Sequence, residues 1–210
     1  MTKIKTLAAL GMILAGLGMI LALAGCGPAH EEAAPKSVAG TVHLCSSCHG
    51  FDGRSVSPTF PILAAQKAEY LEAQLHAFRD HSRADPHAHT YMWGMAAHLD
   101  DQTIAGVAAY FAGLPEAPPK PVNPATVDLA KRIFTEGVAE REVPPCGACH
   151  GDDAKGQGEF PRLASQHAGY LAEQLRHFRS NARSNETMHV NALNLTDAEI
   201  DALANYLSSM

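Results

Sequence analysis

The stretch "CSSCHG", Cys45–Gly50, occurs again about a hundred residues later as "CGACHG", Cys146–Gly151. The segments that follow also repeat: "FPILAAQKAEYLEAQLHAFRDHSR", residues 60–83, aligns without a gap with "FPRLASQHAGYLAEQLRHFRSNAR", residues 160–183. Self-similarity over such a length is the mark of a duplicated structural unit. The chain is therefore predicted to contain two copies of one small domain.

Hydrophobic spacing predicts that both copies are helical. From Tyr70 to Phe78, and again from Tyr170 to Phe178, apolar residues recur at intervals of three and four, which is the period of an amphipathic helix. No strand-like alternation competes with it. The fold class predicted is all-α.

The ends of further helices can be recognised from capping residues. Thr196 and Glu199 form a capping-box pattern ahead of the last helix, and Asp100 or Asp101 is a candidate cap in the first copy. The segment "NPATVDLAKRIFTEG", residues 123–137, predicts a helix before the second cysteine motif, with a proline near its start and a glycine near its end. No such helix is expected before Cys45.

A proline-rich stretch divides the two copies. The sequence "LPEAPPKPVNPAT" contains five prolines, which remove backbone donors and favour extended conformations. Domains this small bury little apolar surface, so they need a covalent cross-link or a cofactor that completes the core. The predicted organisation is a signal peptide at 1–25, a tether at 26–37, a domain at 38–114, a linker at 115–124 and a second domain at 125–210.

The N-terminus has the layout of an export signal. Lys3 and Lys5 precede an apolar run that ends in "LAGC", with Cys26 as its last residue. This resembles the lipobox of bacterial lipoproteins, so Cys26 is expected to become the acylated first residue; an uncleaved transmembrane anchor is the alternative. Removal of the signal leaves 14 basic and 22 acidic residues, a net charge of −8 with histidine neutral. Such an acidic chain is a poor nucleic-acid binder.

The repeated pentad CxxCH is the attachment signal for c-type haem. A zinc site would pair two cysteine knuckles about 15 to 20 residues apart, whereas these are a hundred apart with duplicated flanks. A redox dithiol would require a βαβ context, which the helical pattern does not provide. Two covalently bound haem c groups are therefore predicted, one in each domain, and a histidine follows each pair of thiols as an iron ligand.

Met92 and Met188 are the candidates for the second axial position. Both lie seven residues before the leucine that opens the closing helix of their copy. A thioether favours ferrous iron and raises the reduction potential. Met95 is the rival in the first domain, but its partner in register is Asn191, which cannot serve.

Four histidines near these methionines are weaker candidates for iron ligands. His87 and His89 lie in a polar stretch that the second copy lacks, His98 matches an asparagine, and His189 matches a tryptophan. Solvated positions are predicted for all four.

Together these segments resemble the diheme cytochrome c4 family, in which two class I cytochrome c domains lie in one chain. The resemblance covers residues 38–210 and rests on CxxCH, FPxLAxQ, YLxxQLxxFR and a methionine ahead of the last helix, each present twice. It implies thioether bonds from Cys45, Cys48, Cys146 and Cys149, axial ligation by His49, Met92, His150 and Met188, and proline carbonyls of Pro61 and Pro161 that accept from the proximal imidazoles. Arg79, Arg83, Arg179 and Arg183 are candidate partners of the haem propionates, or else part of a solvated helix face.

The resemblance implies an electron carrier and no enzyme. The expected partners are a quinol-oxidising cytochrome bc complex as donor and a terminal oxidase or periplasmic reductase as acceptor, with no small-molecule substrate. The expected location is the periplasm, on a membrane held by the lipid. The alternatives are a fixed cytochrome subunit of a dehydrogenase or oxidase complex, and a diheme peroxidase with one open haem.

Overall fold

The structure is a computed structural model that describes residues 37–210. The predicted signal peptide, nearly all of the tether and Cys26 lie outside the described residues. The described residues form one unit by their contacts. Among the described residues, no helix is both long and apolar enough to cross a membrane.

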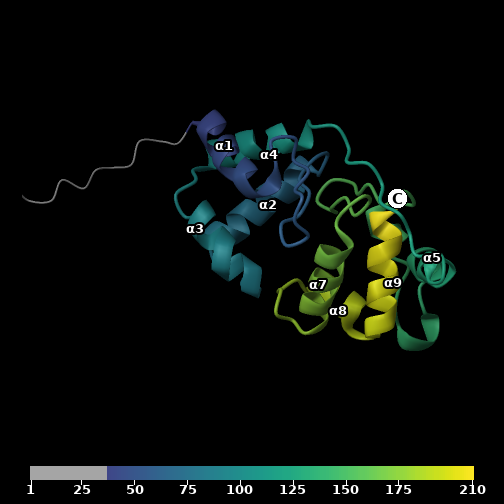
Figure 1. Ribbon diagram of the computed structural model, residues 1–210. Helices are drawn as coiled ribbons and strands as arrows, with labels where there is room; N and C mark the ends of the chain where they lie inside the picture. Colours follow the sequence, from purple (N-terminus) through teal and green to yellow (C-terminus); the bar gives the residue numbers. More distant parts are fainter. Residues whose placement is uncertain (1–36) are drawn as a thin grey trace, which may run out of the picture. The chain divides into compact units, whose positions relative to one another are not determined.

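Helices account for nearly all regular structure in the described chain, in agreement with the all-α prediction (Figure 1). The first half contains α1 (Val38–His49), α2 (Ala68–Arg79), the π-helical turn η1 (Ala88–Met92), α3 (Trp93–Ala96) and α4 (Asp101–Ala112). The second half contains α5 (Val127–Glu136), the 3-10 turn η2 (Ala139–Arg141), α6 (Gly147–His150), α7 (Ala168–Arg179), α8 (Glu186–Leu193) and α9 (Asp197–Ser208). The β pairing within residues 37–210 is limited to two isolated bridges.

The caps of the two closing helices agree with the sequence patterns. Asp100 is the N-cap of α4, and its side chain accepts from the backbone N–H of Thr103. Thr196 and Glu199 form the predicted capping box of α9. Each cap satisfies donors that the first helical turn cannot pair internally, so each closing helix begins at a defined residue.

The expectation that no helix precedes Cys45 is wrong. Helix α1 starts after the N-cap Ser37 and continues through the first cysteine motif. Its sequence contains a glycine and several β-branched residues, which have low helix propensity. However, Val42 of α1 packs into a core cluster with Val107 and Phe111 of α4, so tertiary packing stabilises a helix that local propensity does not predict.

In the second domain, the corresponding segment is divided into two helices. Helix α5 packs against α9 and buries Ile133 and Phe134. It ends at Gly137, where φ is 75° and where an added Cβ would overlap the backbone of Val143. Glycine is required there because the backbone is left-handed and the next segment approaches closely. Helix α6 then carries the second CxxCH motif.

The proline-rich stretch contains no helix and is hydrogen-bonded to both halves of the chain. Arg54 donates to the carbonyls of Pro115 and Glu116, and the Lys120 N–H donates to the Ser208 carbonyl. The Glu116 carboxylate pairs with Lys155. These bonds, together with prolines of restricted φ, limit the freedom of the stretch.

The close approach of α1 to α4 at Gly106 can be tested by substitution. A Cβ at Gly106 would lie 2.5 Å from a methyl group of Val38, so Gly106→Val is expected to lower the free energy of unfolding by about 1–3 kcal/mol through overpacking. Gly94→Val is the matched control, because a Cβ there meets nothing within 4 Å; its effect should stay within about 0.5 kcal/mol. Denaturant unfolding followed by circular dichroism measures both, and equal effects would contradict this packing.

Candidate functional site

Both repeated motifs line a single cavity of about 760 Å³. Its walls include Cys45 and His49 from the first motif and Cys146, Cys149 and His150 from the second. Cys48 is exposed. Leu, Phe and Ala are the most frequent of the remaining lining residues, and they come from both halves. The fold therefore brings two motifs that are a hundred residues apart to one apolar space.

Each motif histidine is held by the proline carbonyl that the resemblance implies. His49 Nδ1 lies 2.9 Å from the carbonyl oxygen of Pro61, and His150 Nδ1 lies 3.0 Å from that of Pro161. Because a carbonyl only accepts, Nδ1 carries the proton and Nε2 keeps its lone pair. Burial lowers the pKa of both histidines, and the carbonyl bond opposes this only in part. Both rings are therefore suited, as neutral imidazoles, to bind a metal through Nε2.

The two methionines in register also line the cavity, whereas their rival does not. Met92 ends the π-helical turn η1 and packs against the cluster around Phe78. Met188 lies in α8, whose N-cap Asn185 accepts from the Met188 N–H at 2.9 Å. Both methionines line the cavity, while 45% of Met95 is exposed. A π-helical turn is often found at a functional site, and here it carries Met92.

The four histidines near the methionines have different surroundings. His89 and His98 are exposed, as predicted. His87 pairs with Glu173 at 3.1 Å, and His189 Nδ1 donates to the Phe178 carbonyl, so these two make defined contacts and are not fully solvated.

The four repeated arginines fall into two pairs with different surroundings. Arg79 donates to the Leu99 carbonyl and to Asp101, and Arg179 makes the equivalent bonds to Leu195 and Asp197. This pair holds the starts of the closing helices. Arg83 and Arg183, in contrast, are buried and line the cavity.

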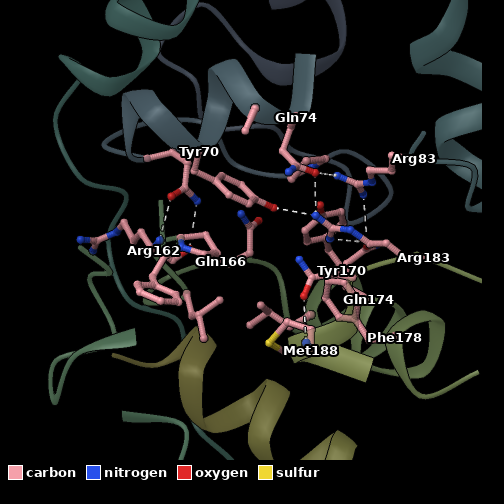
Figure 2. Close-up of a pocket in the computed structure, with 18 of the residues that line it drawn as sticks. Tyr70, Gln74, Arg83, Arg162, Gln166, Tyr170, Gln174, Phe178, Arg183 and Met188 are labelled. Atoms are coloured by element: carbon pink, nitrogen blue, oxygen red, sulfur yellow. Dashed lines mark hydrogen bonds between the residues drawn. The ribbon is translucent and has the colours of Figure 1, made fainter. Parts of the chain in front are cut away.

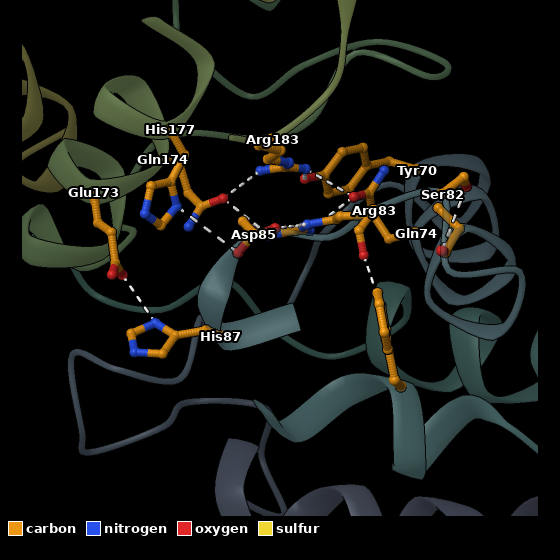
Figure 3. A network of polar contacts seen from close by, with 12 residues as sticks. Tyr70, Gln74, Ser82, Arg83, Asp85, His87, Glu173, Gln174, His177 and Arg183 are labelled. Atoms are coloured by element: carbon orange, nitrogen blue, oxygen red, sulfur yellow. Dashed lines mark hydrogen bonds and ion pairs between the residues drawn. The ribbon is translucent and has the colours of Figure 1, made fainter. Parts of the chain in front are cut away.

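Arg83 and Arg183 each reach across to the other domain (Figures 2 and 3). Arg83 donates to Gln174 at 2.9 Å, and Arg183 donates to Gln74 at 2.7 Å and to the Tyr70 hydroxyl at 2.9 Å. Although burial alone would raise it, the two arginines hold the pKa of Tyr70 below its usual value. Buried guanidinium groups with these acceptors form a polar wall on an otherwise apolar cavity.

Only the first domain has a buried carboxylate in this network. Asp85 is fully buried and accepts from Arg83 Nε at 2.8 Å; the residue in register in the second copy is Asn185. His177 Nδ1 lies 3.8 Å from the other Asp85 oxygen. Burial acts to raise the pKa of Asp85, but the charges of Arg83 and Arg183 outweigh it and hold the pKa below its usual value. The Arg83 charge is thus compensated within its own domain.

The donors present fit a c-type haem in each domain. Each domain supplies two thiols, a proline-bonded imidazole and a thioether, which are the groups that such a haem takes. The cavity adds an apolar lining and, at one wall, two buried arginines suited to carboxylates.

Comparison with known proteins decides the family. A model of the cytochrome c family matches residues 39–115 and again residues 127–210. Cytochrome c-552 of Acidithiobacillus ferridurans is 43% identical over 168 residues, which cover 79% of this chain and 73% of that protein. The solved structure of Acidithiobacillus ferrooxidans cytochrome c4 is similar with a TM-score of 0.75 and 42% identity, covering 79% of this chain and 98% of that one. The chain belongs to the cytochrome c4 family. It is accordingly a diheme electron-transfer protein with two tandem cytochrome c domains and two covalently bound haem c groups.

One relative of this cytochrome c4 chain carries a more specific name. The "Thiosulfate dehydrogenase electron acceptor" of Thiomonas intermedia is 34% identical over 189 residues, which cover 87% of this chain and 83% of that protein.

Sequence reasoning did not find the polar wall. Gln74 and Gln174 recur in the repeated helix, and Gln66 and Gln166 in the FPxLAxQ segment. Their repetition marks them as part of the duplicated unit, but it does not indicate that they contact the other copy. Asp85 has no repeated partner, and its difference from Asn185 was the available clue.

The buried pair of Asp85 and Arg83 generates a pH-dependent prediction. Asp85→Asn leaves Arg83 without its charged partner and should lower the free energy of unfolding near neutral pH by roughly 3 kcal/mol. Since the folded pKa of Asp85 is lowered, its contribution is complete above the ordinary value of 3.8 and is lost as the pH falls through the folded pKa. The stability difference between wild type and variant should therefore shrink below pH 3.8.

Denaturant unfolding at a series of pH values measures this difference. The control is Asp80→Asn, at an exposed carboxylate near the end of α2, which should change stability by less than about 1 kcal/mol. If the difference in unfolding free energy between wild type and Asp85→Asn does not shrink below pH 3.8, the assigned role of Asp85 is contradicted.

Proposed function

We propose that this chain carries electrons between membrane respiratory complexes and a terminal oxidase or periplasmic reductase, with both haems ligated on both faces. The first haem would be held by Cys45, Cys48, His49 and Met92, and the second by Cys146, Cys149, His150 and Met188. When bound, each haem exchanges one electron. The observation that carries the proposal is that a proline-bonded histidine and an inward methionine line the cavity in both domains.

The chain's own residues serve this role by fixing ligands and excluding water. The proline carbonyls hold each imidazole in one tautomer and one orientation. The apolar lining limits solvent around the haems, which tunes the potential. The excess of acidic residues supports electron exchange with partners that present a basic docking surface.

We further propose that export and lipidation keep this carrier in the periplasm. The signal at 1–25 would direct export and then be removed. The tether at 26–37, acylated at Cys26, would hold the domains at 38–114 and 125–210 beside membrane complexes. The motif "LAGC" supports this placement.

A fixed subunit of a dehydrogenase is the second candidate function. The relative named as an electron acceptor of thiosulfate dehydrogenase motivates it, because that name pairs a similar chain with one particular dehydrogenase. Stable co-purification with one membrane enzyme in mild detergent would support this role, whereas rapid electron exchange with several soluble partners would support the mobile carrier.

The ligand assignment predicts different results for two neighbouring methionines. Met92→Ala should abolish the sulfur-to-iron charge-transfer band of the first ferric haem and let that haem bind cyanide, because it removes the thioether. Met95→Ala, the matched control at an exposed position, should leave both bands intact. Absorption spectra of the purified ferric protein measure this. The reverse result would assign Met95, and an open haem in the wild type would favour the peroxidase alternative.

The lipid anchor predicts a change of location for one substitution. Cys26→Ser removes the thiol that would be acylated, so the variant should no longer incorporate labelled fatty acid. It should also lose the membrane binding that the lipid provides. Fatty-acid labelling and cell fractionation measure both effects. A wild-type protein that incorporates no label yet stays in the membrane would instead support an uncleaved anchor.

A further inference from the structure

Two buried glutamines bind the backbone of the opposite domain beside the proximal proline. Gln166 of the second domain accepts from the Ile62 N–H at 2.8 Å and donates to the Ile62 carbonyl at 2.9 Å. Gln66 of the first domain accepts from the Arg162 N–H at 2.7 Å and donates to the Arg162 carbonyl at 3.0 Å. Only 7% of Gln66 and 5% of Gln166 are exposed. The arrangement is reciprocal, and Figure 2 shows Arg162 and Gln166 on the side of the cavity away from Arg83 and Arg183.

The peptide group bound by each glutamine is the one that holds the histidine. The Pro61 carbonyl and the Ile62 N–H belong to one amide; its oxygen accepts from His49 Nδ1 and its N–H donates to Gln166. The amide between Pro161 and Arg162 is bound in the same way by His150 and Gln66. A continuous chain of two hydrogen bonds therefore joins each imidazole to a side chain of the other domain.

Such a chain acts on the imidazole by polarisation. An acceptor at the N–H of an amide increases the negative charge on its carbonyl oxygen, and hydrogen bonds linked in this way strengthen one another most at buried sites. A stronger acceptor at Nδ1 makes the imidazole a better donor to ferric iron, which lowers the reduction potential.

We infer that Gln166 is a positioning and tuning residue for the proximal histidine of the first haem, and Gln66 for that of the second. The inference rests on the proposed ligation by His49 and His150, and it goes beyond that ligation because each domain sets part of the potential of the other. The glutamines do not touch iron; they act through the peptide group and the imidazole.

The test replaces each glutamine with methionine, which has a similar length but no amide. Gln166→Met should raise the potential of the first haem, with an increase of about two-fold in its reduced-to-oxidised ratio at a fixed potential, and leave the second nearly unchanged. Gln66→Met should give the converse, so each variant is the matched control of the other. Redox titration followed by the hyperfine-shifted NMR signals of the ferric haems measures both, and Met92→Ala identifies the signals of the first haem.

A purely structural role would produce another pattern. It predicts that the potential shifts for the haem in the mutated domain, or equally for both haems, and either result would overturn the inference. If the methionine variants do not fold, Gln166→Glu and Gln66→Glu keep an acceptor oxygen and should not raise the potential of the opposite haem; a rise would also overturn it. Failure of the ligation itself would be visible beforehand, as wild-type haem spectra without histidine and methionine ligation.

Discussion

The hydrogen bond from each motif histidine to a proline carbonyl is the constraint on which the rest of the site depends. It joins the helix that carries CxxCH to a loop 12 residues later in the first domain and 11 residues later in the second. The same bond fixes the imidazole tautomer and so decides which nitrogen remains for iron. The N–H of the residue after each proline belongs to the same peptide group as the proline carbonyl. The bond therefore also connects each histidine to the glutamine that accepts from that N–H.

The contacts between the two domains are built from the segments that repeat. Gln66 binds the backbone of Arg162 in the second domain, and Gln166 binds the backbone of Ile62 in the first. In the same reciprocal way, Gln74 accepts from Arg183 and Gln174 accepts from Arg83. Reciprocal contacts of this kind are those of a two-fold symmetric dimer, in which one patch pairs with a copy of itself. A single domain with a self-complementary patch is thus sufficient, once duplicated, to form both halves and the contact between them.

Much of the fold and of the site was predictable because each depended on local pattern. The helical period, the caps at Asp100 and Thr196, and the CxxCH motifs are all short-range features. Helix α1 was missed because its stability comes from packing on α4 and not from its own propensity. The roles of the four glutamines could not be predicted, since they depend on how the two copies face each other, which neither copy encodes alone.

Differences between the two haem environments must arise where the copies have diverged. Asp85 compensates the buried Arg83 within its own domain, whereas Asn185 leaves Arg183 with neutral acceptors. The charge of Arg183 also acts to lower the pKa of Asp85, so both guanidinium groups act on the one buried carboxylate of the network. The repeated residues therefore give the two domains the same set of candidate haem ligands, and the few residues that differ give the two halves of the cavity different charge surroundings.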